Sequence, residues 1–176
     1  TAIQTPPDSE TNTETSTKTL VSALKDPFFR IREKALKGLD LSQSNVSKLA
    51  LSEVEKLAAN ETKTLVQAAA ISALVKTKNA KYMSLYEKGM SAVSNSVKGA
   101  SLAGIASLDP SKVASLAGNV DLENASEDLI SSLLPIIVKN KIESQMSAIA
   151  STVAFYPFLK FQNPELGKSA EEGYNW

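Results

Sequence analysis

The sequence predicts an all-α protein, built as a right-handed solenoid of helical hairpins with a longer helical region that caps its C-terminal end. One helix-forming phrase occurs three times, over residues 31–39, 66–74 and 97–105, so the copies start 35 and then 31 residues apart. In each copy a β-branched residue is followed by a small residue four positions on and by large aliphatic residues five and eight positions on, which is one face of a helix. Such periods, with a second amphipathic helix between copies, are typical of stacked hairpins. No segment shows sustained two-residue alternation between hairpin turns, so we expect essentially no sheet.

The first 17 residues differ from the rest of the chain. They are polar and Thr-rich, carry Pro6-Pro7, and offer only Ile3 as a large apolar side chain. Such a segment cannot offset the entropy of ordering itself, so residues 1–17 are predicted to be a linker or the ragged edge of a preceding domain. Residues 18–176 are then predicted to form the solenoid domain, beginning with a short helix over about residues 18–25.

Turn signals separate the hairpins. Asp26-Pro27 offers a capping side chain and a proline that can open a helix, and the first copy of the phrase follows. A helix that starts at Asn45 or Ser47 ends at the break over residues 60–62, and the second copy follows. The third hairpin joins a helix with Tyr82, Leu85, Tyr86 and Met90 to the third copy. Asp109-Pro110 then repeats the turn signal ahead of Val113, Leu116 and Val120.

Beyond residue 120 the pattern changes. A helix over residues 126–138 is expected to point Ile130, Leu133, Leu134 and Ile137 inward and to bend at Pro135. A longer helix from Ile142 places Met146, Ile149 and Val153 on one face. The aromatic residues that follow it are Phe155, Tyr156, Phe158 and Phe161. We interpret them as a cap on the last apolar face, with a peptide-binding groove as the alternative.

Charge and hydropathy limit the kinds of partner. Nineteen basic and nineteen acidic residues balance, which argues against nucleic acid or an anionic membrane as a partner of the whole chain. The longest apolar stretch, over residues 129–138, is about half as long as a membrane-spanning helix. The segment over residues 18–40 is locally basic, through Lys18, Lys25, Arg30, Arg32, Lys34 and Lys37. It is either a solvated helix face or a patch for an anionic partner.

Catalytic, cofactor-binding and metal-ligating residues are all predicted to be absent. The chain has no His and no Cys, which removes imidazole acid–base chemistry, the nucleophile systems that depend on it, thiolate metal sites and disulfides. Carboxylates such as Glu53 and Glu55, or Glu171 and Glu172, are too close in sequence to face one another on a helix. Gly99 and Gly104 lie within the third phrase and are assigned to close helix packing.

The phrase with its preceding turn, KDPFFRIREKALKGL and then NETKTLVQAAAISAL, resembles the second helices of HEAT-like repeats, in which Asp-Pro opens the turn and a Val/Ile-Arg pair leads the inner helix. Arg32 keeps the basic position of that pair, whereas Gln67 departs from it and Lys98 approximates it. The period is shorter than in typical HEAT repeats, so these would be degenerate copies.

The order of a Thr-rich lead, three hairpins, the stretch LLPIIVKNKIESQMSAIASTVAFYPFL and the tail NPELGKSAEEGYNW resembles the C-terminal HEAT-like region of bacterial zinc aminopeptidases of the aminopeptidase N family. The resemblance covers most of residues 18–176. It implies a non-catalytic module, cut from a longer chain, that packs on a zinc-bearing catalytic domain and helps to enclose or gate its peptide chamber. Zinc and its His-Glu-x-x-His motif would belong to that preceding domain, in an exported or a cytoplasmic parent. The alternative is a free-standing HEAT-like adaptor that binds a peptide or protein partner.

Overall fold

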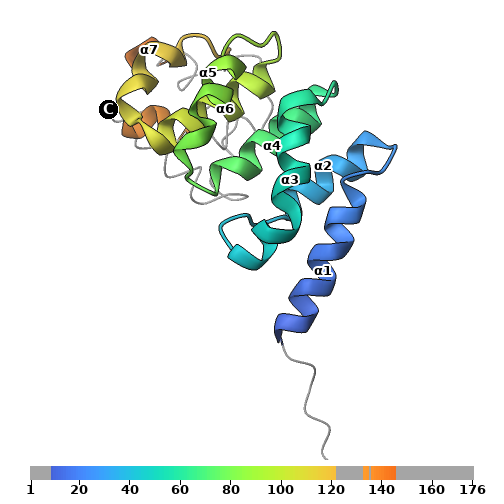
Figure 1. The fold of residues 1–176 in the computed structure, drawn as a ribbon. Helices are drawn as coiled ribbons and strands as arrows, with labels where there is room; N and C mark the ends of the chain where they lie inside the picture. The colour runs from blue at the N-terminus through green and yellow to red at the C-terminus, as the bar shows by residue number, and fades with distance from the viewer. Residues whose placement is uncertain (1–8, 122–132, 135, 146–176) are drawn as a thin grey trace, which may run out of the picture. The chain divides into compact units, whose positions relative to one another are not determined.

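The chain is all-helical in the computed structural model, which describes residues 9–121, 133–134 and 136–145 (Figure 1). No residue in these ranges lies in a strand, so the all-α prediction is confirmed. The chain divides into two compact units, Thr1–Thr77 and Lys78–Trp176. The division falls inside the region that the sequence analysis assigned to one solenoid domain.

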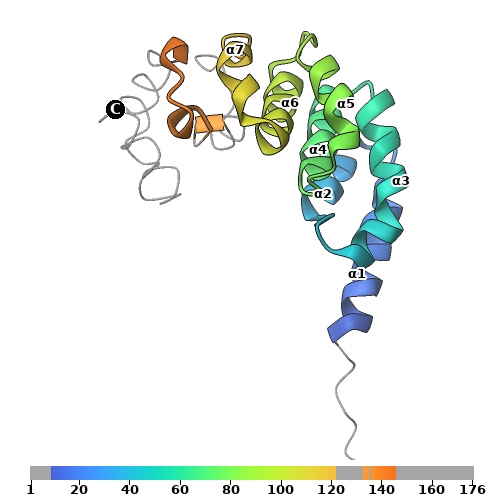
Figure 2. The same cartoon turned by 60° about the vertical axis from the view of Figure 1, so that its left-hand side comes forward.

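Unit 1 consists of two helical hairpins. The first joins α1 (Ser9–Ala23) to α2 (Phe29–Gly38), and the second joins α3 (Ser44–Asn60) to α4 (Thr64–Val75). Helix α1 contacts α3, and α2 contacts α4, so corresponding helices of the two hairpins lie next to each other (Figure 2). Unit 1 therefore has two layers, one made of α1 and α3 and the other of α2 and α4.

Unit 2 is built around the pair of α5 (Met83–Gly89) and α6 (Asn95–Leu108), which pack against each other. The short turn η1 (Ala80–Tyr82) leads into α5, and η2 (Pro110–Lys112) leads into α7 (Val113–Ala117). Residues 133–134 and 136–139 are helical, and η3 (Glu143–Gln145) follows. The buried Gln145 side chain donates hydrogen bonds to the carbonyl oxygens of Ala117 and Val120, which ties η3 to the end of α7.

The three copies of the phrase lie on α2, α4 and α6, and their apolar register is confirmed. The small residue four positions into each copy and the large residues five and eight positions in are all buried. These residues are Ala35, Leu36 and Leu39 in the first copy, Ala70, Ile71 and Leu74 in the second, and Ser101, Leu102 and Ile105 in the third. The first position departs from the pattern, because Val66 and Val97 are buried whereas Ile31 is 43% exposed.

Two helix starts differ from the sequence prediction. Helix α1 begins at Ser9, nine residues before the predicted start, because Thr17 is buried, α1 packs on α3, and Glu14 pairs with Lys18 one turn later at 2.7 Å. Helix α2 begins at Phe29, so Pro27 precedes the helix and does not occupy its first turn. Of the C-terminal predictions, Leu133, Leu134 and Ile137 are buried as expected. The longer helix predicted to start at Ile142 does not start there, because Ile142 is not helical and residues 143–145 form the 3₁₀ turn η3. Ile130, Pro135, Met146 and the residues after it lie outside the described residues.

The turns that precede several helices share one hydrogen bond. A side-chain oxygen accepts the backbone N–H of the residue two positions on, which satisfies a donor that the helix cannot pair internally. Asp26 does this ahead of α2 at 2.8 Å, and Glu61 ahead of α4 at 2.9 Å. Asp109 accepts from Ser111 in the same way, with Pro110 as the first residue of η2, so the capping role predicted for this Asp-Pro pair is confirmed.

Glycines bring α5 and α6 close together. A Cβ atom at Gly104 would lie 2.7 Å from Cγ and Cδ2 of the Tyr86 ring, and a Cβ atom at Gly89 would lie 3.0 Å from Cβ of Ser101. Tyr86 is 1% exposed, and burial, followed by the neighbouring Tyr82, raises its pKa to about 12. The predicted packing role of Gly104 is thus confirmed, and the ring of a buried tyrosine occupies the space that its missing side chain leaves.

Candidate functional site

Helix α2 exposes a face that combines apolar and basic side chains. Its members are Phe28, Arg30, Ile31, Lys34 and Lys37, which we call the α2 face. Lys34 has Arg30 and Ile31 one turn before it and Lys37 one turn after it, so these side chains are neighbours on the helix surface. Phe28, at the N-terminal end, is 56% exposed. The face therefore places two apolar side chains, Phe28 and Ile31, beside three cations.

The start of this face is held in place by Arg32. Its Nη1 donates to the carbonyl oxygens of Asp26 and Pro27 at 2.7 and 3.1 Å, and its Nε and Nη2 lie 3.0 and 2.8 Å from Oε2 of Glu61. Oε1 of Glu61 accepts the Lys63 N–H. The Arg32 guanidinium therefore links the turn before α2 to the turn before α4 and fixes the position of Phe28.

The electrostatics of this cluster follow from its hydrogen bonds. Burial raises the pKa of Glu61, but the N–H of Lys63, the hydrogen bond from Arg32 and the charge of Arg32 together outweigh burial, so the pKa lies below its ordinary value of 4.5. Since the folded chain favours the ionised carboxylate, the pair stabilises the fold above about pH 4.5. That contribution is lost as the pH falls through the lowered pKa of the folded state.

Replacing Glu61 with glutamine should therefore lower the free energy of unfolding by about 1–2 kcal/mol at pH 7, because the half-buried Arg32 loses its charged partner. Urea denaturation at several pH values measures the effect. The difference between the chain and the variant should shrink as the pH falls below about 4.5. Glu143→Gln is the control, since Glu143 is exposed and should change the free energy by less than about 0.5 kcal/mol. A difference that does not depend on pH would contradict this account of the cluster.

Most of the basic side chains between residues 18 and 40, which the sequence marked as a locally basic segment, have acidic partners. Lys18 pairs with Glu14, Lys25 with Glu53, and Arg32 with Glu61. Arg30 and Lys37 share Glu33, each at 3.2 Å. The solvated-face interpretation accounts for these residues. Lys34 differs, because it is exposed and has no ion pair with any residue in the described ranges.

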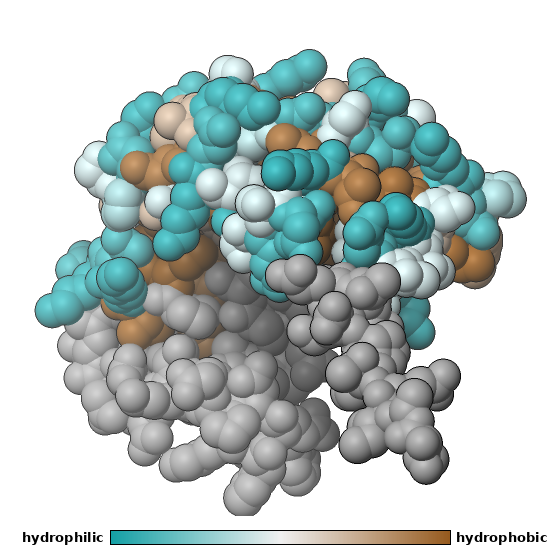
Figure 3. All heavy atoms as spheres, turned by 60° about the horizontal axis from the view of Figure 1, so that its bottom comes forward, coloured by the Kyte–Doolittle hydropathy of each residue, from teal (hydrophilic) through white to brown (hydrophobic). Residues whose placement is uncertain are grey.

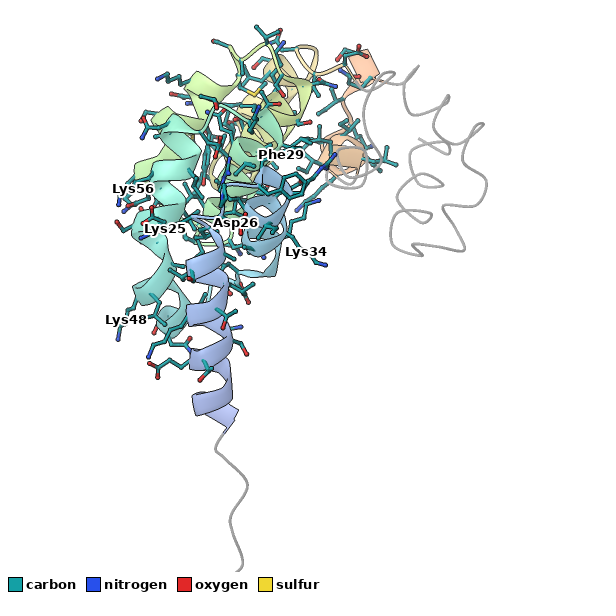
Figure 4. All side chains as sticks on the ribbon, turned by 90° about the vertical axis from the view of Figure 1, so that its right-hand side faces the viewer. Lys25, Asp26, Phe29, Lys34, Lys48 and Lys56 are labelled. Carbon is teal, nitrogen blue, oxygen red and sulfur yellow. The ribbon has the colours of Figure 1, made fainter. Side chains whose placement is uncertain are left out.

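The α2 face and the exposed lysines of α3 lie on opposite sides of unit 1. Figure 4 shows Phe29 and Lys34 on the side of unit 1 opposite to Lys48 and Lys56, which project from α3. The ring of Phe29 lies edge-on to that of Phe28, with centroids 5.5 Å apart, and the Arg30 guanidinium lies 5.1 Å from the Phe29 centroid. The Phe28–Phe29 pair and the Arg30 guanidinium thus lie together at the start of the face.

Other exposed apolar surface is scattered. On the face drawn in Figure 3, apolar side chains form separate patches between hydrophilic ones. Within the described ranges, the large apolar side chains that remain exposed are Phe28, Ile31, Leu49, Leu65 and Val93. Phe28, the residue before α2, and Ile31 are one turn apart, and the Ile31 N–H donates to the Phe28 carbonyl at 3.0 Å. The α2 face therefore brings two of these five side chains together.

A cavity of about 580 Å³ opens between α1 and α3. It is lined by Glu14, Thr17, Ser44, Asn45, Lys48 and Leu49. Its one carboxylate and its one ammonium group are both exposed, and Glu14 is paired with Lys18. The hydrogen bond from Lys18, followed by its charge, lowers the pKa of Glu14, which keeps this carboxyl ionised at neutral pH. The wall offers no buried, charge-coupled pair of the kind that acid–base catalysis uses.

Of the carboxylates singled out in the sequence, the structure describes Glu53 and Glu55. Glu53 pairs with Lys25 and Lys56 on the surface of unit 1, and Glu171 and Glu172 lie outside the described residues. In the part of the chain that the structure describes, no three acidic side chains gather as metal ligands would. In the same part, no helix is both long enough and apolar enough to cross a bilayer.

Sequence reasoning missed the exposure of Ile31, which the phrase placed on the buried face. The sequence carries a sign of this exposure at Lys34, three residues after Ile31. The second and third copies have alanine at that position, Ala69 and Ala100, and both side chains are buried, whereas the first copy has the exposed Lys34. A long charged side chain at a position that is otherwise small and buried indicates a face that no helix of the described residues covers. A comparison of this chain with protein-family models, with curated proteins and with solved structures finds no match in any of the three.

Proposed function

We propose that the chain is a non-catalytic, HEAT-like docking module, and that the domain on which it packs is the catalytic domain of a zinc aminopeptidase. The observation that carries the docking role is the α2 face, where Phe28 and Ile31 stay exposed although the residue equivalent to Ile31 is buried in α4 and in α6. Exposed apolar side chains that adjoin one another are a common mark of a protein contact.

The stacking of hairpins in unit 1 supports a solenoid as the framework of this module. Helices α1 and α3 adjoin, as do α2 and α4, and this is how consecutive repeats bury one another's apolar faces. The aminopeptidase assignment rests on the resemblance of residues 18–176 in phrase order. In this proposal the module encloses or gates the peptide chamber of its parent, and the zinc belongs to the parent's catalytic domain.

The assignment to a parent enzyme is tested by sequencing the source gene upstream of the Thr1 codon. An in-frame His-Glu-x-x-His motif followed by a downstream glutamate is the expected result. A start codon directly ahead of Thr1 would overturn the aminopeptidase assignment, and the chain would then be an adaptor that binds a peptide or protein partner.

The purified chain should also hold no stoichiometric zinc and release no product from an aminoacyl chromogenic substrate. The reason is that it lacks His and Cys, the side chains that most often bind zinc with nitrogen and sulfur. Elemental analysis after dialysis and a spectrophotometric assay measure both properties. One zinc ion bound per chain would contradict the proposal that the chain is non-catalytic.

A further inference from the structure

We propose that the α2 face receives a helix of a partner protein whose contact surface carries carboxylates beside apolar residues. This inference rests on the docking role proposed above and adds the place and the chemistry of the contact.

The repeats themselves indicate that the occupant is a helix. The positions equivalent to Ile31 and Lys34 are Val66 and Ala69 in α4, and both are buried in a helix that packs on α2 and α3. In α6 they are Val97 and Ala100, which are also buried. This side of the phrase is therefore buried in α4 and in α6, whereas in α2 it stays exposed, as a helix surface of the kind that packs against another helix.

Charge selects what kind of helix fits. Three cations on the α2 face, Arg30, Lys34 and Lys37, stand against one carboxylate, Glu33, which Arg30 and Lys37 already share. Burying Lys34 against an apolar helix would leave its ammonium group without a partner, which is unfavourable. A carboxylate on the incoming helix removes that cost. A second copy of the chain is a poorer occupant, because its own α2 face would bring further cations.

An anionic membrane would offer the same charge, but the face suits it less well. Stable attachment to anionic lipid takes a cluster of about 4–8 basic residues, and here two of the three cations are bound to Glu33. The chain as a whole has no net charge to add attraction. A protein helix, which needs one carboxylate opposite Lys34 and apolar contact with Phe28 and Ile31, fits the observed groups better.

The test uses the full chain labelled with ¹⁵N and a pair of synthetic peptides of about 18 residues, a length at which a helix becomes accessible. Both peptides carry leucines on one face, followed by glutamates in the first and by lysines at the same positions in the second. Nuclear magnetic resonance titration locates the contact and gives the affinity. We expect the glutamate peptide to shift the amide signals of residues 27–38, and the lysine peptide to bind at least about threefold more weakly.

Two variants and two matched controls assign the contact to its residues. Ile31→Ser should weaken binding of the glutamate peptide about tenfold, and Lys34→Glu should weaken it about threefold to tenfold and reverse the preference between the peptides. Both residues are exposed, so the variants should keep the circular dichroism of the parent chain. Val93→Ser and Lys48→Glu change the same residue classes at exposed positions elsewhere and should leave binding unchanged.

Three results would overturn this inference. The first is a set of shifts that centres on another element, and the second is no shift with either peptide. The third is binding to vesicles of phosphatidylglycerol and phosphatidylcholine that shifts residues 27–38 while the peptides do not, which would make the occupant a membrane. None of these results bears on the gene sequence or the zinc content, so the proposed function fails or stands by its own tests.

Discussion

Replacing Leu36, Ile71 or Leu102 with alanine should lower the free energy of unfolding by about 2–5 kcal/mol in each case. The three side chains are at most 1% exposed and occupy the same position in the three copies of the phrase. Each substitution removes buried methyl and methylene groups and leaves a cavity that the surrounding helices fill only in part. Leu36 and Ile71 report on unit 1, and Leu102 reports on unit 2.

Urea denaturation followed by circular dichroism measures this effect, with Val93→Ala as the control. Val93 is a fully exposed aliphatic residue, so its truncation should change the free energy by less than about 0.5 kcal/mol. If alanine at Leu36, Ile71 and Leu102 were as harmless as alanine at Val93, the register that equates the three copies would be wrong.

Replacing Gly104 with alanine should destabilise unit 2 by about 2–3 kcal/mol, because the added methyl group would overlap a buried ring. Three ring atoms of Tyr86 lie 2.7–2.8 Å from the position of the new Cβ, and the ring is too deeply buried to move into solvent. Either α5 must shift away from α6 or Tyr86 must leave its rotamer. The thermal midpoint and the near-ultraviolet circular dichroism of the tyrosines measure both consequences.

Gly118→Ala is the matched control for this prediction. Gly118 follows α7 with φ −59° and ψ −16°, a conformation that alanine adopts readily, and a Cβ atom there would meet nothing within 4 Å. The substitution should be neutral or should stabilise the chain by up to about 1 kcal/mol, since alanine restricts the unfolded chain. Equal destabilisation by both alanines would contradict the assignment of the effect to the contact with Tyr86.

The buried register was predictable because it depends on spacing alone. A small residue and two large ones at fixed intervals fix one face of a helix, and nine of nine such positions are buried. The breaks at Asp26, at residues 60–62 and at Asp109 were predictable for a similar reason, since the side chains that stop and start helices there act on backbone groups within a few residues.

Features that depend on distant neighbours were not predictable in this way. The extension of α1 to Ser9 needs α3 as a packing partner, which composition does not reveal, and the exposure of Ile31 depends on what lies beside α2. The contact of Arg32 with Glu61 spans 29 residues and joins two turns that the sequence analysis treated separately. The solenoid, the resemblance to zinc aminopeptidases and the absence of a catalytic role stay predictions.

The uneven burial of the two phrase helices in unit 1 has a consequence for motion. Helix α4 buries seven of its 12 residues, whereas α2 buries only Ala35 and Leu36 among its 10. Local opening requires little free energy where few apolar contacts must break, so α2 should exchange its amide hydrogens sooner than α4. A partner that binds only closed α2 would then slow this exchange in proportion to its occupancy, so that of these two helices the one that opens more readily would be the one that binding stabilises.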